Sequence, residues 1–231
     1  MTTMRQIPLA IGPEPLPTFN SFVVGANAAA LDYLQTLPPV PATPSPAPVY
    51  LWGPQGSGKT HLLRALAYRW QQAGALVGWF VAGDPVPWSW VKGWSLIVID
   101  DCAELDEVAQ QAAFALLVDA TTEGVQLVAA GSMPPVDLPL REDLRTRLAW
   151  GHVFAMQALA EAETRAALRR EADHRGIFLS DEVMDFLLTR YPRDLRHLMR
   201  TLDQLDHFAL ARSRPVTVPL VKLMMQDLGA A

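Results

Sequence analysis

The sequence has little of several features, and each shortage excludes a class of protein. Its 231 residues include one cysteine, Cys102, so no internal disulfide can form. No apolar run approaches the ~18 residues that a membrane-spanning helix needs, and residues 1–10 lack the charged and apolar regions of a secretory signal. The net charge of −5 argues against a broad basic surface for nucleic acid. We therefore expect a cytoplasmic protein without membrane association.

Basic residues are present but unevenly placed. Residues 1–140 hold 5 basic and 11 acidic side chains, whereas residues 141–231 hold 14 and 13. Of those 14 basic side chains 13 are arginines, which suit bidentate contacts with phosphates and carboxylates. Most arginines on helices form solvated ion pairs, so only a few are expected to do more.

Prolines and hydrophobic periodicity divide the chain. Six prolines between Leu37 and Pro48 predict an extended surface loop, which follows a proline-punctuated leader and a short helical pattern at 26–37. After the loop, apolar runs alternate with helical patterns. The expected strands are 49–52, 77–81, 96–99 and 126–130, and the helices between and after them are 61–73 and 108–122. Runs that are apolar on both faces and separated by helices predict a buried parallel sheet.

From Ala160 onward the strand signal stops. Helical spacing covers residues 160–175, 183–190, 195–211 and 219–228, and Ser180 is a suitable N-cap. The sequence thus predicts a leader at 1–18, an α/β nucleotide-binding domain at 19–158 and a small helical lid domain at 159–231.

The strongest chemical signal is the octapeptide Gly53-Pro54-Gln55-Gly56-Ser57-Gly58-Lys59-Thr60. It fits the phosphate-binding loop at every fixed position, and its glycines let backbone N–H groups turn toward phosphate oxygens. Lys59 would neutralise phosphate charge, and the Thr60 hydroxyl would help to hold Mg²⁺. The following helix, from His61, directs the positive end of its dipole at the anion. A glycine-rich turn without nucleotide is the alternative.

A second signal is the apolar run that ends in Asp100 and Asp101. Beside a phosphate loop, Asp100 would coordinate Mg²⁺, and Asp101 would orient or deprotonate the attacking water. Two aspartates after a strand can also be an ordinary transition from strand to loop, and the role of Asp101 is the less secure of the two.

These motifs, taken with three later segments, resemble a known family. The segments are Leu144-Arg145-Thr146-Arg147-Leu148-Ala149-Trp150-Gly151, Arg193-Asp194-Leu195-Arg196 and Thr201-Leu202-Asp203-Gln204-Leu205-Asp206. In order and spacing they resemble the AAA+ ATPase core of the replication initiator DnaA, and above all the Hda family of DnaA regulatory inactivators. The resemblance implies an α/β P-loop NTPase core, with a parallel sheet flanked by helices and a small C-terminal helical lid domain, that binds ADP or ATP with Mg²⁺.

The resemblance also assigns two arginines. Arg147 matches the family's arginine finger, which acts on a neighbour's nucleotide, and Arg193 matches the sensor II arginine that touches the bound nucleotide. Arg145 is the competing candidate for the finger. The alternative for both finger candidates is a surface ion pair with Glu142 or Asp143, and that for Arg193 is an ion pair with Asp194 or Asp181.

The leader carries a partner signal. Gln6-Ile7-Pro8-Leu9-Ala10-Ile11 resembles the peptide with which replication proteins, Hda among them, bind the ring-shaped sliding clamp. Gln6 would hydrogen-bond at the pocket edge while Ile7, Leu9 and Ile11 enter an apolar groove in extended form. The departures from the usual peptide are Ile7 in place of Leu and Ala10 where Pro or an aromatic residue is more common.

Other segments leave alternatives open. The position that resembles sensor I falls at Gly131-Ser132, where the family commonly has Asn, Thr or Asp. Three tryptophans before the second motif, Trp88, Trp90 and Trp94, favour a hydrophobic cover over a base-stacking platform. Cys102 is most simply a packed thiol.

Together these features predict a negative regulator of replication initiation. Bound to a loaded sliding clamp and holding ADP or ATP, it would present Arg147 to ATP on DnaA and promote its hydrolysis. The sequence ends soon after the lid, without a helix-turn-helix module, so sequence-specific DNA binding is not expected. The alternatives are a self-assembling or helicase-loader-like ATPase whose own turnover is the function, and a clamp-binding adaptor with a vestigial nucleotide site.

Overall fold

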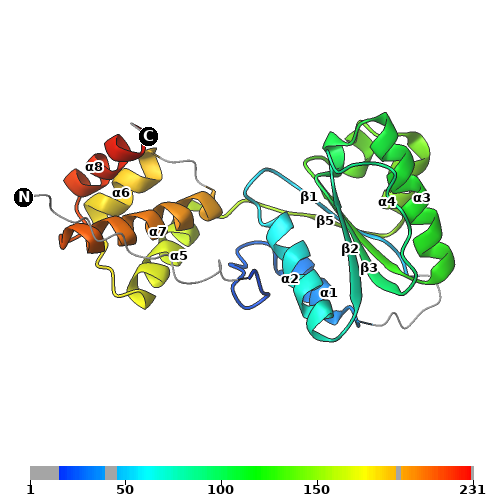
Figure 1. Ribbon diagram of the computed structural model, residues 1–231, viewed down its shortest axis with the longest axis horizontal. Coiled ribbons are helices and arrows are strands. Elements are labelled where there is room, and N and C mark those ends of the chain that lie inside the picture. Colours follow the sequence, from blue (N-terminus) through cyan, green and yellow to red (C-terminus); the bar gives the residue numbers. More distant parts are fainter. Residues whose placement is uncertain (1–15, 40–45, 191–193, 230–231) are drawn as a thin grey trace, which may run out of the picture. The chain divides into compact units, whose positions relative to one another are not determined.

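A computed structural model describes residues 16–39, 46–190 and 194–229 (Figure 1). The chain divides into two compact units at the junction of Ala158 and Leu159. The first unit holds the sheet and the second holds only helices, and each has its own hydrophobic core.

The first unit is built on a five-stranded parallel sheet with strand order β2-β3-β4-β1-β5. The strands are β1 (Val49–Trp52), β2 (Leu76–Val81), β3 (Trp94–Asp100), β4 (Gln126–Gly131) and β5 (His152–Ala155). The central strands are buried on both faces, so their side chains alternate between two apolar layers. In β3, for example, Ile97 and Ile99 enter one core while Leu96 and Val98 enter the other.

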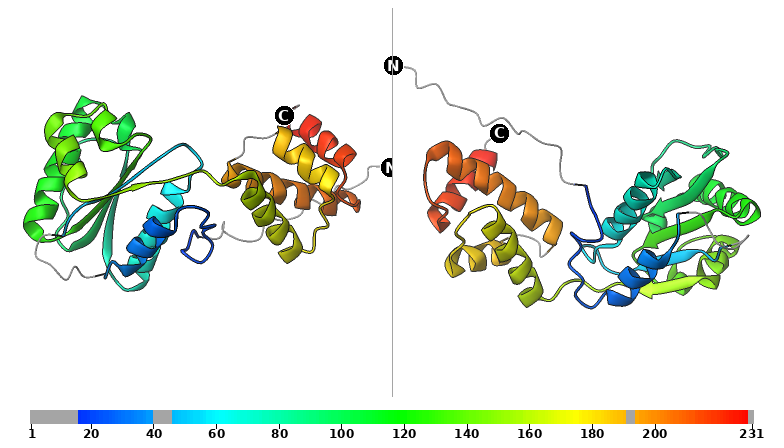
Figure 2. Two further views of the ribbon diagram at one scale, coloured as in Figure 1. Left: turned by 180° about the vertical axis from the view of Figure 1, so that it is seen from behind. Right: turned by 90° about the horizontal axis from the view of Figure 1, so that it is seen from below.

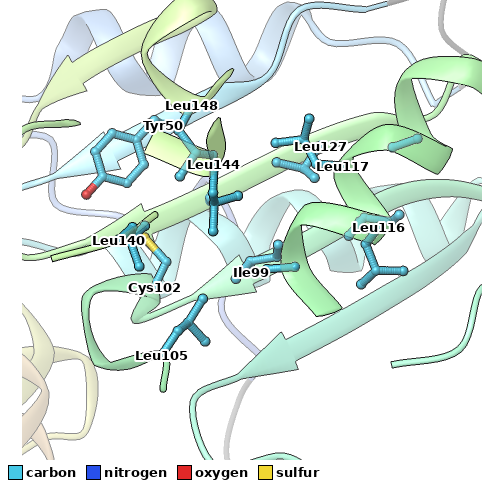
Figure 3. Packing of buried hydrophobic residues seen from close by; sticks show 14 of the residues in the cluster. Tyr50, Ile99, Cys102, Leu105, Leu116, Leu117, Leu127, Leu140, Leu144 and Leu148 are labelled. Atoms are coloured by element: carbon cyan, nitrogen blue, oxygen red, sulfur yellow. The ribbon is translucent and has the colours of Figure 1, made fainter. Parts of the chain in front are cut away.

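Helices cover both faces of this sheet. α1 (Ala28–Thr36) and α2 (Lys59–Gln72) pack side by side on one face, as the views in Figures 1 and 2 show. α3 (Glu107–Glu123) and α4 (Glu142–Trp150) cover the other face, and Leu116 and Leu144 contribute to the core drawn in Figure 3. Two short 3-10 helices, η1 (Cys102–Glu104) and η2 (Pro135–Asp137), lie in the connections after β3 and β4.

The second unit consists of α5 (Glu161–His174), α6 (Asp181–Arg190), α7 (Leu195–Arg212) and α8 (Val218–Gly229). Its core is formed by leucine, valine and methionine side chains from all four helices. The Ser180 hydroxyl accepts a hydrogen bond from the Val183 N–H at 3.3 Å, as its predicted cap role requires. Ion pairs among the described residues of this unit involve Arg165, Arg169, Arg175 and Arg212.

The fold class predicted from the sequence is confirmed: a parallel sheet flanked by helices, followed by a helical lid. The sequence patterns did not predict β5 or α4. α2 begins at Lys59, two residues before the helix expected from the sequence. In the part of the chain that the structure describes, no helix combines the length and apolar character needed to cross a membrane.

Candidate nucleotide site and arginine surface

The predicted phosphate loop connects β1 to α2 at the carboxyl edge of the sheet. Gly58 is the N-cap of α2 and has a φ of 93°, a left-handed conformation that favours glycine. A Cβ at Gly58 would lie 2.6 Å from the Phe22 ring, and one at Gly53 would lie 2.2 Å from the Met156 carbonyl oxygen. Backbone conformation and close neighbours therefore both require these two glycines.

Lys59 is folded onto this loop. Its Nζ donates to the carbonyl oxygens of Gly53 at 2.7 Å and Pro54 at 2.9 Å, and lies 3.4 Å from the Ser57 hydroxyl. Burial lowers the pKa of Lys59, while the nearby charges of Asp101 and Asp100 raise it. The loop thus holds a buried ammonium beside two carboxylates.

Asp100 and Asp101 lie where β3 ends. Asp100 is buried, which raises the pKa of its carboxyl, while interaction with the Thr60 side chain lowers that pKa. Asp101 has a φ of 51°, and its N–H donates to the Asp100 carboxylate at 3.1 Å. The structure therefore brings together Thr60 and Asp100, the two predicted ligands of Mg²⁺, and leaves Asp101 exposed next to them.

The residues present fit a magnesium ion that shares its ligands with a nucleotide. Among the residues described, no group of three or more His, Cys, Asp or Glu side chains could hold a metal by itself. Mg²⁺ usually binds through one or two carboxylates together with substrate phosphates and water, so one carboxylate and one hydroxyl are a suitable protein share.

His61 faces the segment that precedes α1. Its Nε2 lies 2.9 Å from the Thr18 carbonyl oxygen and 3.3 Å from the Ser21 hydroxyl, and its ring lies 5.5 Å from that of Phe22. Burial lowers the pKa of His61. Its side chain thus secures residues 18–22 against the phosphate loop.

α4 carries both finger candidates on the opposite face of the sheet from α2. Arg147 is exposed, and its Cζ lies 5.8 Å from the centroid of the Phe114 ring. Arg145 is half-buried. The carboxylate of Asp143 pairs with Arg141 at 2.8 Å rather than with either candidate. Within the described ranges, no carboxylate lies within ion-pair distance of Arg147.

Five predicted site residues lie outside the described residues: Gln6, Ile7, Leu9 and Ile11 of the leader, and Arg193. The roles expected for these five residues stay predictions. Of the two carboxylates considered as partners of Arg193, Asp181 pairs with Arg169 and Asp194 caps α7.

Two buried polar residues near these sites had not been singled out from the sequence. The Tyr50 hydroxyl donates to the Met133 carbonyl oxygen at 2.7 Å. The Gln110 amide accepts from the Arg141 N–H at 2.8 Å and donates to the carbonyl oxygens of Leu105 and Pro139. Their partners are distant in sequence, so no local pattern marks them.

The tryptophan segment is a hydrophobic cover. Trp88 is buried and stacks on Phe80 with ring centroids 4.8 Å apart, and Trp94 packs edge-on against both Phe80 and Trp90. These rings contact one another and the core on the α3 side of the sheet.

Comparison with known proteins gives two family matches and many similar structures. Residues 161–225 match the Hda lid domain, and residues 14–77 match the bacterial DnaA ATPase domain. Domain III of DnaA from Thermotoga maritima is 23% identical over 93% of this chain and 98% of its own, with a TM-score of 0.72. AMPPCP-bound DnaA from Aquifex aeolicus is 20% identical over 84% of this chain, with a TM-score of 0.68.

A more distant structure is the RuvB Holliday junction branch migration motor from Thermotoga maritima, 19% identical over 79% of this chain, with a TM-score of 0.59. The chain spans 65% of the Aquifex DnaA and 62% of this RuvB. At these identities the solved structures establish the fold. The two family matches add that two segments of the chain are related to domains of Hda and bacterial DnaA. The chain thus has the AAA+ fold of DnaA, with a segment at 14–77 related to the bacterial DnaA ATPase domain and a lid at 161–225 related to that of Hda.

Proposed function

We propose that this protein is a cytoplasmic negative regulator of replication initiation that stimulates hydrolysis of ATP bound to DnaA. The observation that carries the proposal is the exposed Arg147 on α4, which packs on the Phe114 ring instead of pairing with a carboxylate. Its charge remains available to an anion on another molecule. The protein's own phosphate loop leads into α2, which covers the opposite face of the sheet from α4.

The protein's own nucleotide, ADP or ATP, would occupy the loop from Gly53 to Thr60. AMPPCP-bound DnaA from Aquifex aeolicus has the same fold, which supports this assignment. Backbone N–H groups of the loop would bind phosphate oxygens and Lys59 would neutralise their charge, while Thr60 and Asp100 would hold Mg²⁺. Arg193 would contact the same nucleotide, and Asp101 would orient a water molecule.

Arg147 would act in trans. A guanidinium beside the terminal phosphate of ATP stabilises charge in the phosphoryl-transfer transition state, and such a residue contributes ~10³–10⁵ in rate. A cation packed on an aromatic ring keeps its full charge, whereas a carboxylate partner would neutralise it. The sliding clamp would bring the protein to DnaA through Gln6, Ile7, Leu9 and Ile11 of the leader.

The test is DnaA-dependent phosphate release on clamp-loaded DNA. Arg147→Ala should abolish the stimulation and leave binding of the clamp and of nucleotide unchanged. Arg141→Ala is the matched control, because Arg141 packs on the same ring but is paired with Asp143. Full stimulation by Arg147→Ala, or its loss only in Arg145→Ala, would refute the finger assignment.

A truncated protein without residues 1–12 tests the clamp step. It should fail to bind the clamp in a pull-down and should lose stimulation, while its affinity for nucleotide stays unchanged. If the truncated protein still binds the clamp, the leader is not the clamp-binding segment.

A second candidate function is favoured by the exposed Asp101 beside Asp100, an arrangement suited to activating water in the protein's own site. Under this alternative the protein would be a self-assembling ATPase. Rapid phosphate release by the isolated protein, without DnaA or clamp, would favour it over the regulatory function.

A further inference from the structure

A buried tyrosine connects the strand before the phosphate loop to the turn after β4. Tyr50 lies three residues before Gly53, is fully buried, and belongs to the core cluster drawn in Figure 3. Its hydroxyl donates to the carbonyl oxygen of Met133 at 2.7 Å. It also interacts with the thiol of Cys102, which follows Asp100 and Asp101. Tyr50 therefore links three segments that approach the site: β1, to which it belongs, the turn after β4, and the segment after the two aspartates.

The turn is held at a second point. The Gly53 N–H donates to the Gly131 carbonyl oxygen at 3.3 Å. The carbonyl oxygens of Gly131 and Met133, on either side of Ser132, thus accept hydrogen bonds from Gly53 and Tyr50. The Ser132 side chain itself is exposed. Glycine at position 131 leaves room for the Tyr50 hydroxyl, since a Cβ there would lie 2.4 Å from the hydroxyl oxygen.

Strand register places this turn at the phosphate end of the site. β4 lies between β3 and β1, with Gly131 paired to Trp52 and Ala129 paired to Ile99. Ser132 therefore emerges between the phosphate loop and the two aspartates, because parallel strands end at the same edge of the sheet.

From this geometry we infer that Tyr50 is a positioning residue, which holds the turn after β4 so that the Ser132 hydroxyl meets the terminal phosphate of a bound nucleoside triphosphate. The inference rests on the proposed nucleotide binding. It assigns Tyr50 a part in distinguishing a triphosphate from a diphosphate.

The short side chain of serine makes such support necessary. A hydroxyl donor must come within about 3.0 Å of its acceptor, and a serine cannot compensate for a shifted backbone by extending its side chain. The donor end of this bond lies in the core and its acceptor end lies on the partly exposed turn, so the bond ties the turn to a buried strand. Removing the hydroxyl of Tyr50 would leave Met133 without that donor and let the turn move.

The experiment measures affinities for AMPPCP and ADP, each with Mg²⁺, by calorimetry on the full-length protein. The variants are Ser132→Ala, Tyr50→Phe and the double variant. Ser132→Ala should lower the preference for AMPPCP over ADP by about tenfold, the effect of one lost hydrogen bond to a charged group. Tyr50→Phe should lower the preference to a similar extent, and the double variant should lower it no further than Ser132→Ala alone.

Tyr33→Phe is the matched control. Tyr33 is a half-buried tyrosine in the same unit, on the α1 side of the sheet against His152 and Phe154. Its variant should keep the wild-type preference. Thermal unfolding of all four variants establishes that each is folded at the titration temperature, and titrations at 10 °C accommodate a less stable one.

Amide hydrogen exchange of Tyr50→Phe supplies the second readout. Exchange should be faster than in the wild type at Ser132 and Met133 and unchanged at Leu62 and Leu63 in α2. Unchanged exchange at the turn would overturn the inference, as would a normal preference in Tyr50→Phe, no effect of Ser132→Ala, or additive effects in the double variant. Failure of the wild-type protein to bind either nucleotide would instead refute the proposed function itself.

Discussion

The Nζ of Lys59 donates a hydrogen bond to the carbonyl oxygen of Gly53 at 2.7 Å, so this lysine closes the loop to which it belongs. Two neutral carbonyl oxygens accept hydrogen bonds from its buried ammonium group. Desolvation already lowers the pKa of Lys59. Phosphate oxygens are charged and form stronger hydrogen bonds than carbonyl groups do. We therefore expect nucleotide to replace these internal bonds and to stabilise the folded protein.

Lys59→Ala should abolish stabilisation by nucleotide. In the wild type, AMPPCP with Mg²⁺ at one hundred times its Kd should add about 2.7 kcal/mol to the free energy of unfolding, seen as a higher Tm. The variant should show no increase at the same concentration, because the phosphate charge loses its buried partner. Lys92→Ala, which changes an exposed lysine in the loop before β3, should respond like the wild type. An equal Tm increase in Lys59→Ala would contradict the loop assignment.

Gln110 joins the segment after the two aspartates to the start of α4. Its amide donates to Leu105 at 2.9 Å and to Pro139 at 3.3 Å, and accepts from the N–H of Arg141. Gln110→Leu should lower the free energy of unfolding by about 1–3 kcal/mol, because buried backbone groups lose their partners. Denaturant titration measures this loss.

The neighbouring exposed residue supplies the control for that substitution. Gln111→Leu introduces the same side chain on the solvent side of α3, where it should change stability by less than about 0.5 kcal/mol. Equal losses in the two variants would mean that the bonds of Gln110 do not stabilise α4.

The central sheet was predictable because its signal is local. β1, β3 and β4 are short apolar runs flanked by helical patterns, and burial on both faces explains why they lack alternation. β5 gave no such signal, since His152 and Val153 are exposed in an edge strand of four residues. α4 was missed as a helix because only Leu144 and Leu148 of its nine residues are buried.

Only those parts of the candidate site that belong to local sequence motifs could be predicted. The phosphate loop and Asp100 lie in short segments whose chemistry follows from residue type. The supports of the site do not: Tyr50 and Met133 are 83 positions apart, and Gln110 and Arg141 are 31 apart. Such contacts depend on strand order, which no local pattern reveals. The preference for Arg147 over Arg145 likewise gained a physical argument only from the exposed position of Arg147 against Phe114.

Cys102 should be unreactive in the native protein. The thiol is 1% exposed, and burial raises its pKa to about 12, so at pH 8 it remains protonated and covered. In the unfolded chain the pKa returns to about 8.5 and a sizeable fraction becomes thiolate. A chromogenic disulfide reagent at pH 8 should therefore react slowly with native protein and rapidly in denaturant. Rapid reaction of the native protein would contradict the packing around Tyr50.

Gly131 and Tyr50 should show compensating effects on stability. Gly131→Ala places a methyl group 2.4 Å from the Tyr50 hydroxyl oxygen, and crowding of this kind costs about 1–3 kcal/mol of unfolding free energy. Adding Tyr50→Phe removes that oxygen, after which the nearest atoms are the Cys102 sulfur at 3.1 Å and the ring Cζ at 3.3 Å. The double variant should therefore be more stable than Gly131→Ala alone, although Tyr50→Phe by itself should be destabilising because it removes the bond to Met133.

The sign of that coupling is what distinguishes direct crowding from general disruption of the core. Tyr33→Phe combined with Gly131→Ala removes a hydroxyl on the other side of the sheet and should recover nothing. Denaturant titrations of the wild type, the single variants and both double variants give the two coupling energies. If the pair containing Tyr50→Phe is no more stable than Gly131→Ala, the hydroxyl does not occupy the space beside residue 131, and the turn that carries Ser132 is held by the bond from Gly53 alone.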